Sequence, residues 1–158
     1  MKRPVRERKH RLPHDVYVGE IVAAFTICIQ DRNAFFTTEE RFRIFEKILL
    51  DELRANLCDA VVYLFMPDHC HLLLKGISEE SDLLKVVKMF KQKTGFWFYK
   101  GIKDIRWEKG FYDHIVRDDG EIERQVRYIL SNPLRANLVD EWKEYKYKGS
   151  SLFNLGEW

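Results

Sequence analysis

The sequence of 158 residues has the length of one compact domain, and we expect a single domain over residues 1–158. A hydrophobic fraction of 46% and an aromatic fraction of 14% argue against a disordered chain. The three cysteines, Cys28, Cys58 and Cys70, have no paired spacing, which excludes a disulfide scaffold and a four-cysteine zinc site. The longest apolar run, residues 60–66, is too short to cross a bilayer, and the first residues do not form a signal peptide. We therefore expect a cytoplasmic protein with no membrane partner.

Positive charge is concentrated at the N-terminus. The net charge of the whole chain is only +2. Residues 1–14 nevertheless contain a single acidic residue, Glu7. The same segment has six basic residues: Lys2, Arg3, Arg6, Arg8, Lys9 and Arg11. Such a basic arm suits contact with a phosphate backbone, although a solvated tail has the same composition. Arg3, Arg6, Arg8, Lys9 and Arg11 are thus candidate DNA-binding residues.

The first half of the chain predicts a strand, a helix and a hairpin. Residues 21–30 are β-branched and apolar, which is typical of a strand. Thr37 and Glu40 have the spacing of a capping box, and the apolar spacing that follows predicts a helix to near Asn56. Residues 59–66 and 69–75 then read as two strands joined by the turn residues 67–68.

The second half predicts two more helices and one strand. Ser81 can cap a basic helix that ends near Gly95, and residues 111–117 alternate as a strand does. Asp118 or Asp119 can cap a third helix, which must stop at Asn132 because Pro133 follows. The predicted fold is α+β and ferredoxin-like, a βαββαβ antiparallel sheet with helices on one face. The third helix, which carries Tyr128, follows the last strand of this fold, and residues 134–158 form a C-terminal extension.

His69 and His71 are the first residues that suggest chemistry. Residues i and i+2 of a strand point to the same face, so both imidazoles project side by side while Cys70 points away. This spacing suits two ligands of one divalent metal, and it also occurs in a simple polar stripe on a strand. A complete metal site would need a third ligand from elsewhere in the chain.

The helix before Pro133 carries a second polar set. Ile122, Val126 and Ile129 lie within a narrow wedge that should dock on the sheet. Tyr128 and Asn132 are four residues apart and therefore share a stripe at the edge of this wedge, together with Glu121 and Gln125. The tyrosine hydroxyl can then reach the sheet, and the Asn132 amide oxygen can act as a neutral ligand. Alternatively, Tyr128 simply covers the rim of the sheet.

Several motifs, taken together and in this order, resemble the IS200-like single-tyrosine (HUH) transposases, most of all the REP-associated branch. They are Leu12-Pro13-His14, residues 66–71 (MPDHCH), residues 110–114 (GFYDH), residues 128–136 (YILSNPLRA), and Trp142 with Ser150-Ser151. The resemblance therefore covers most of the chain. This sequence departs from the family pattern at Asp68, which replaces the usual asparagine, and at Asn137, which replaces the usual glycine. Asparagine tolerates a left-handed backbone and can stand in for glycine there.

The resemblance implies cleavage and rejoining of single-stranded DNA, with hairpin-forming repeats as the expected substrate. Tyr128 would be the nucleophile and would form a 5′-phosphotyrosine, and His69, His71 and Asn132 would hold Mg²⁺ or Mn²⁺ against the scissile phosphate. The covalent link conserves the energy of the phosphodiester, which fits the absence of a Walker-type glycine loop. Relatives of this kind work as monomers or as homodimers.

Other residues are candidates for supporting roles. Lys85, Lys88 and Lys91 on the second helix and Arg135 beyond Pro133 are candidate phosphate contacts. His114 could approach the histidine pair or hydrogen-bond a phosphate, and it could equally be a hydrogen-bonded sheet residue. Gln125 lies one turn before Tyr128 on the same stripe. Tyr112 is the alternative nucleophile, but it has no amide ligand at helical spacing.

Two other functions fit the same residues. One is a non-catalytic nucleic-acid-binding domain with vestigial histidines, and the other is a metal-dependent phosphoesterase that forms no covalent intermediate. The presence of His69, His71, Tyr128 and Asn132 in one chain argues against the first of these.

Overall fold

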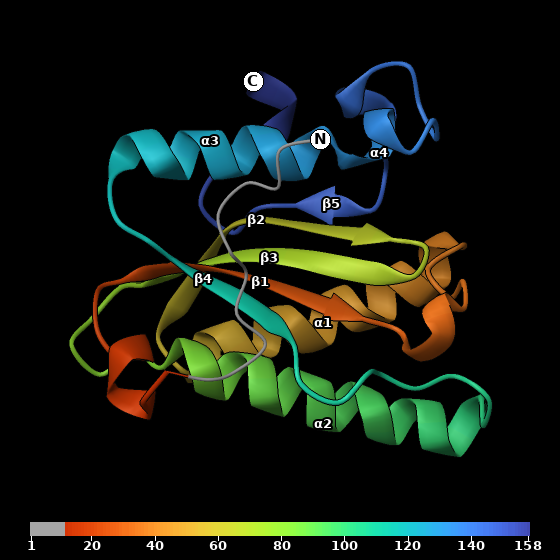
Figure 1. Ribbon diagram of the computed structural model, residues 1–158, viewed down its shortest axis with the longest axis horizontal. Helices are drawn as coiled ribbons and strands as arrows, with labels where there is room; N and C mark the ends of the chain where they lie inside the picture. The colour runs from red at the N-terminus through yellow and green to blue at the C-terminus, as the bar shows by residue number, and fades with distance from the viewer. Residues whose placement is uncertain (1–11) are drawn as a thin grey trace.

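The computed structural model describes residues 12–158, which form an antiparallel sheet flanked by helices (Figure 1). The spatial order of the strands is β4-β1-β3-β2-β5. Their bounds are β1 (Val22–Cys28), β2 (Cys58–Met66), β3 (His69–Gly76), β4 (Tyr112–Val116) and β5 (Lys148–Gly149). The predicted α+β class and the predicted order of strands and helices are confirmed.

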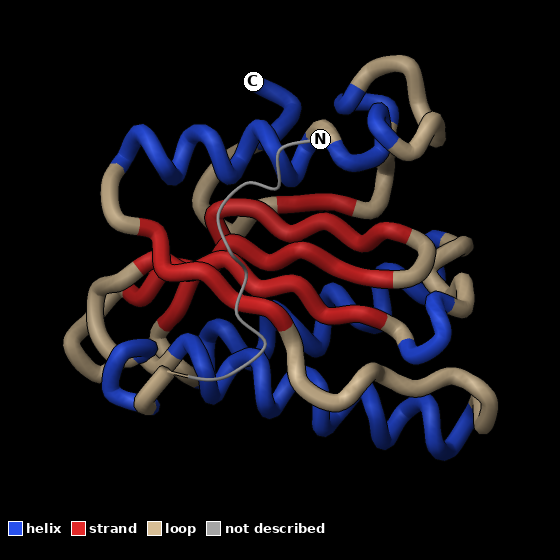
Figure 2. The backbone as a smooth tube through the Cα atoms, viewed as in Figure 1, coloured by secondary structure: helices blue, strands red, loops and turns tan. Residues whose placement is uncertain are grey.

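The helices lie on both faces of this sheet. The long helices are α1 (Glu39–Ala55), α2 (Leu83–Gly101) and α3 (Asp119–Leu130), and α4 (Asn132–Arg135) is one short turn. The described residues also form four 3₁₀ turns: η1 (His14–Tyr17), η2 (Gln30–Arg32), η3 (Trp142–Glu144) and η4 (Leu155–Glu157). Figure 2 shows α1 and α2 covering one face of the sheet, while α3 and the C-terminal residues cover the other.

The strands are apolar on both sides because both faces are covered. Phe25, Phe65 and Leu72 point into the core under α1 and α2. Leu64 and Leu73, from the alternate positions, join Val126 and Ile129 of α3 in a second core on the opposite face. The alternation of β3 therefore decides which layer each of its side chains enters.

The caps of two helices differ from the prediction by one residue. Thr38, not Thr37, accepts the hydrogen bond from the Arg41 N–H that caps α1. Asp82, not Ser81, caps α2, since the Ser81 hydroxyl is used in the preceding turn, where it accepts from two backbone N–H groups. Asp118 caps α3, one of the two residues predicted for that position.

Two helix ends were also predicted wrongly. α2 continues past Gly95 to Gly101 because Phe98 is buried in the core and outweighs the cost of a glycine in a helix, about 1 kcal/mol. α3 ends at Leu130, two residues before the predicted end, and α4 resumes the helical direction at Asn132. Within residues 12–158, no helix combines the length and the apolar character that a membrane span needs.

Asn137 adopts the conformation that its replacement of glycine predicts. Its φ angle is 57°, in the left-handed region, at the point where the chain leaves α4. The next N–H, of Leu138, donates to the Pro133 carbonyl and closes the turn at 2.9 Å. The C-terminal residues then run back to pair as β5 with β2, a strand that the sequence analysis did not predict.

Candidate active site

His69 and His71 lie side by side on the face of β3 that α3 covers. Their ring centroids are 4.9 Å apart, with the rings nearly perpendicular at 86°. Cys70, between them, points to the opposite core, as the strand alternation predicts. His71 is 7% exposed, so its imidazole is almost enclosed. His69 is the first residue of β3 and lies next to the turn that joins β2 to β3.

Both imidazoles are held through their Nδ1 atoms. His71 Nδ1 is 3.1 Å from the Thr26 hydroxyl, which the pairing of β1 with β3 places directly opposite. His69 Nδ1 is 2.6 Å from the Asp68 carboxylate, and the second carboxylate oxygen lies 3.7 Å from the Arg32 guanidinium. These contacts leave the Nε2 atoms as the free ligating positions and fix the orientation of both rings.

The environment keeps His71 neutral. Burial lowers its pKa well below the usual value, and the charges of His69, Arg135 and Arg32 act in the same direction. The hydrogen bond with His69 lowers the pKa of Asp68, which keeps that carboxylate ionised. A neutral imidazole and an ionised carboxylate partner are the states in which a histidine binds a metal ion.

α3 brings Tyr128 to the histidine pair. Val126, Ile129 and Leu130 are buried against β2 and β3, which fixes the rotation of the helix about its axis. Tyr128 then lies beside His71, with ring centroids 6.3 Å apart and an interplanar angle of 81°. The tyrosine predicted from the helix and the histidines predicted from the strand thus meet in one place.

The turn after α3 adds a cation and an amide. The Arg135 guanidinium lies 4.3 Å from the Tyr128 ring centroid, and it donates to the Ser131 hydroxyl. The backbone stays helical through this turn, because Arg135 N–H bonds the Ser131 carbonyl at 3.0 Å. Asn132 therefore remains about one turn beyond Tyr128, as its spacing predicts.

The side chains at this site could supply nitrogen and oxygen ligands to a divalent metal ion. Residues 12–158 contain no group of three or more His, Cys, Asp or Glu placed to bind a metal, so a third protein ligand would have to be of another type. The Asn132 amide nitrogen is buried and has no hydrogen-bond partner within the described chain. Rotation by half a turn about the last side-chain bond exchanges this nitrogen with the amide oxygen, a neutral ligand. Imidazole ligands favour softer ions such as Zn²⁺, and an amide oxygen favours Mg²⁺ or Mn²⁺, so this donor set is compatible with several divalent ions.

His114 and Gln125 lie on the same face but have different neighbours. His114, on β4, is hydrogen-bonded to Glu121, which also accepts from the Arg117 N–H at 2.9 Å. This contact lowers the pKa of Glu121 and ties β4 to the first turn of α3. Gln125 is half-buried on α3, three residues before Tyr128. In this structure His114 therefore has the role of a hydrogen-bonded sheet residue.

The α2 lysines are not brought to this site. α2 covers the opposite face of the sheet, where Lys85 and Lys88 are exposed (Figure 1). Lys91 donates to the carbonyl oxygens of Glu108 and Gly110 at 2.9 and 2.6 Å, so it holds the loop before β4. Arg3, Arg6, Arg8, Lys9 and Arg11 of the basic arm lie outside the described residues.

Thr26 and Arg32 belong to the site but were not predicted from the sequence. Thr26 lies inside an apolar strand, and only the register of β1 against β3 reveals that it faces His71. Arg32 reaches Asp68 from η2, where its own φ angle is 54°. A threonine in an otherwise apolar strand was the one available signal.

The contact between Asp68 and His69 gives the first prediction. Replacing Asp68 with alanine should weaken Mn²⁺ binding by about 10- to 100-fold, because His69 loses the partner that orients its ring and raises its basicity. Asp68→Asn should retain most of the affinity, since its amide oxygen can still accept from Nδ1. Titration of Mn²⁺ by electron paramagnetic resonance measures both variants, and wild-type affinity in Asp68→Ala would contradict the prediction.

A tyrosine of α3 beside two histidines of β3 is the arrangement expected of one class of enzyme, the single-tyrosine transposases. The chain belongs to the IS200-like family of that class: residues 17–132 match the family described as "Transposase IS200 like". It is therefore a DNA transposase. Among its relatives is a Haemophilus influenzae protein named "Putative REP-associated tyrosine transposase", 28% identical over 138 residues, or 78% of this chain and 76% of that protein. The REP-associated tyrosine transposase of Escherichia coli is 20% identical over 123 residues, or 78% of this chain and 72% of that protein.

Solved structures share the fold. The structure of a REP-associated tyrosine transposase bound to a REP hairpin matches with a TM-score of 0.74 at 18% identity, over 89% of this chain and 81% of that one. A putative transposase from Deinococcus radiodurans matches with a TM-score of 0.52 at 19% identity, over 71% of this chain and 91% of that one.

Proposed function

We propose that this transposase cleaves and rejoins single-stranded DNA through a 5′-phosphotyrosine on Tyr128, with Mg²⁺ or Mn²⁺ held by His69, His71 and Asn132. The observation that carries the proposal is the distance of 6.3 Å between the Tyr128 and His71 rings, with His69 4.9 Å further along the strand. A scissile phosphate between them would be within reach of both the phenol and the two free Nε2 atoms.

The reaction exchanges one phosphodiester bond for another. The Tyr128 hydroxyl oxygen attacks phosphorus and loses its proton, while the bond from phosphorus to the 3′ oxygen breaks and that oxygen gains a proton. The products are a 5′-phosphotyrosine and a free 3′-hydroxyl, and attack by a 3′-hydroxyl reverses the step without ATP. A bound divalent ion would draw charge from the non-bridging phosphate oxygens.

The chain's own residues prepare this step. The Arg135 guanidinium above the Tyr128 ring places positive charge beside the oxygen that becomes negative and beside the phosphate. The buried side chains of Val126, Ile129 and Leu130 hold the helix against the sheet, so the phenol is oriented before DNA arrives. Thr26 and Asp68 fix the two imidazole rings in the same way.

The substrate we propose is DNA with hairpin-forming repeats. A solved structure of the same fold is titled as bound to a REP hairpin. This supports a strand that is partly paired and partly single, whose single-stranded part enters the site between α3 and β3.

We also propose that one chain carries a complete site, because Tyr128 and His71 meet within a single copy. Mixing Tyr128→Phe with His71→Ala protein should then give no cleavage above that of either variant alone. Incubation of the mixture with labelled DNA and Mn²⁺ measures this, and cleavage restored in the mixture would show that two protomers exchange α3.

A covalent-adduct assay tests the reaction itself. Single-stranded hairpin DNA carrying the label downstream of the cleavage site is incubated with protein and Mn²⁺, then separated under denaturing conditions. A labelled band at the mass of protein plus DNA supports the proposal, since the label stays with the 5′-phosphate. Cleavage with no adduct would instead indicate a phosphoesterase, and binding with no cleavage would indicate a DNA-binding domain.

A further inference from the structure

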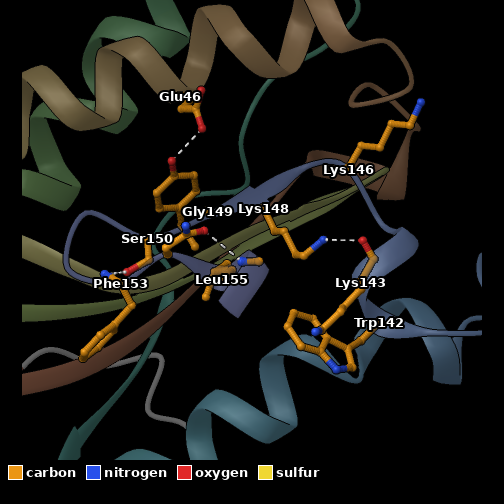
Figure 3. A pocket seen from close by; sticks show the side chains of 12 residues that line it. Glu46, Trp142, Lys143, Lys146, Lys148, Gly149, Ser150, Phe153 and Leu155 are labelled. Atoms are coloured by element: carbon orange, nitrogen blue, oxygen red, sulfur yellow. Dashed lines mark hydrogen bonds between the residues drawn. The ribbon is translucent and has the colours of Figure 1, made fainter. Parts of the chain in front are cut away.

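A pocket of about 340 Å³ lies at the β5 edge of the sheet (Figure 3). It is formed by Glu46 of α1, by Tyr63 of β2, by β5 and by the C-terminal residues that follow α4. Its lining combines aromatic rings with lysines: Tyr63, Trp142, Lys143, Lys146, Lys148 and Phe153. None of these residues takes part in the proposed cleavage step.

The floor of the pocket depends on a glycine. Gly149 pairs with Tyr63, and a Cβ atom at position 149 would overlap the Tyr63 hydroxyl and ring. The absence of that atom lets the Tyr63 ring lie against the β5 backbone. The Tyr63 hydroxyl donates to the Glu46 carboxylate at 2.5 Å, which holds the ring in place.

The pocket is electropositive. Of the residues that line it in the described chain, Glu46 is the one with a carboxylate, and that carboxylate is bound by Tyr63 and by Arg43 at 2.7 Å. Lys143 and Lys146 are exposed at the rim. Lys148 is half-buried and donates to the carbonyl oxygens of Tyr145 and of Lys143, the latter at 3.1 Å, and burial lowers its pKa.

Trp142 lies between two of these cations. The ammonium groups of Lys143 and Lys148 are each 5.6 Å from its ring centroid. The ring is half-buried and packs on the core beneath α3, so its position is fixed. A rigid indole flanked by ammonium groups is suited to an aromatic ligand that carries negative charge, which describes a nucleotide.

The strand pairing also shows how far the pocket lies from the histidines. Leu64 of β2 pairs with His71 on one side and with Lys148 on the other. Two strand spacings therefore separate the backbones of His71 and Lys148, or roughly 10 Å. A stacked DNA strand covers such a distance in about three nucleotides at ~3.4 Å each.

We infer that this pocket binds a nucleotide of the single-stranded DNA a few positions from the cleaved bond, with its base against Trp142 and its phosphates at Lys143, Lys146 and Lys148. The inference rests on the proposed function for its substrate, DNA. Its role would be to fix the path of the strand, so that the correct phosphate lies beside Tyr128.

Removal of two exposed lysines tests the phosphate contacts. In the Tyr128→Phe background, Lys143→Ala/Lys146→Ala should weaken binding of a fluorescein-labelled, mixed-sequence 20-nucleotide single strand by roughly 5- to 20-fold, measured by anisotropy at low salt. The slope of log affinity against log salt should fall in magnitude by about 1.4, at about 0.7 for each phosphate contact of a single strand. Lys100→Ala/Lys103→Ala, which removes two exposed lysines from and after α2, is the matched control and should leave the slope nearly unchanged.

A photo-crosslink tests the stacked base directly. The same strand with 5-iodouracil in place of thymine is irradiated on wild-type protein, and the crosslinked peptide is identified by mass spectrometry. A crosslink on Trp142 or Tyr63 supports the inference. Equal affinities and slopes for the two double variants would overturn it, as would a crosslink to Trp142 from free 5-iodo-dUMP but not from the strand. The covalent-adduct assay on wild-type protein is scored separately: an adduct with no effect at the pocket leaves the cleavage mechanism standing and removes only this inference.

Discussion

Replacing Tyr128 with phenylalanine should abolish the covalent DNA adduct and lower the rate of cleavage by at least roughly 1000-fold. The variant loses the oxygen that we propose attacks phosphorus, and it retains the ring that contacts His71 and Arg135. Its melting temperature should therefore stay close to that of the wild type. Single-turnover cleavage of labelled hairpin DNA in Mn²⁺, with thermal unfolding measured in parallel, separates lost chemistry from lost structure.

Tyr112 provides the matched control for this change. Tyr112 lies on β4 opposite Thr26, and Thr26 lies opposite His71. Tyr112 is therefore two strands away from His71, in the same line of paired residues across the sheet. Tyr112→Phe removes a hydroxyl near the site without removing the proposed nucleophile, and adduct formation should remain near the wild-type level. An adduct that persists in Tyr128→Phe and is lost in Tyr112→Phe would assign the nucleophile to β4 and overturn the proposed mechanism.

Local patterns were sufficient to predict the placement of His69, His71 and Tyr128, but not of Thr26 or Arg32. The two-residue period of β3 predicts that His69 and His71 share a face, and the structure confirms it. The apolar wedge of α3 predicts which side of the helix docks, and Tyr128 follows from its place at the edge of that wedge. Each inference depends on a single strand or a single helix, so the residue pattern within that segment is sufficient to make it.

Relations between distant elements could not be predicted in this way. The contact of Thr26 with His71 depends on a strand register across 45 positions of the chain. The lysine pattern of α2 indicates a solvated face, but it contains no information on which side of the sheet that face lies. The sequence around Lys91 does not distinguish it from Lys85 and Lys88. In the structure, however, Lys91 donates to two carbonyl groups of the loop before β4.

The structure of the C-terminal extension also depends on contacts with distant residues, so it could not be predicted from local patterns. β5 has two residues, too few for any alternation to be recognised, and its position depends on the contact between Gly149 and Tyr63. Apart from the left-handed backbone at Asn137, residues 134–158 therefore gave no prediction of structure, although they supply most of the lining of the pocket to which we assign a nucleotide.

We expect Mn²⁺ to stabilise the fold, and replacing His71 with alanine should remove that stabilisation. An ion that binds only the folded state at 100 times its dissociation constant adds about 2.7 kcal/mol to the free energy of unfolding. For a protein of this size, that raises the melting temperature by roughly 5–10 °C. Without the His71 Nε2 atom the ion loses a ligand from the most enclosed part of the site, so the shift should disappear and DNA cleavage should fall by at least about 100-fold.

The shift on adding Mn²⁺, rather than the melting temperature itself, is the informative quantity. His71→Ala also leaves the Thr26 hydroxyl without its partner and a small cavity beside Tyr128, so the metal-free variant should already melt at a lower temperature. His14→Ala is the matched control, because His14 lies in η1, more than half exposed, and is paired with Asp82 at 2.7 Å. A metal-induced shift that survives in His71→Ala, or one that vanishes in His14→Ala, would place the ion away from β3 and remove the metal from the proposed mechanism.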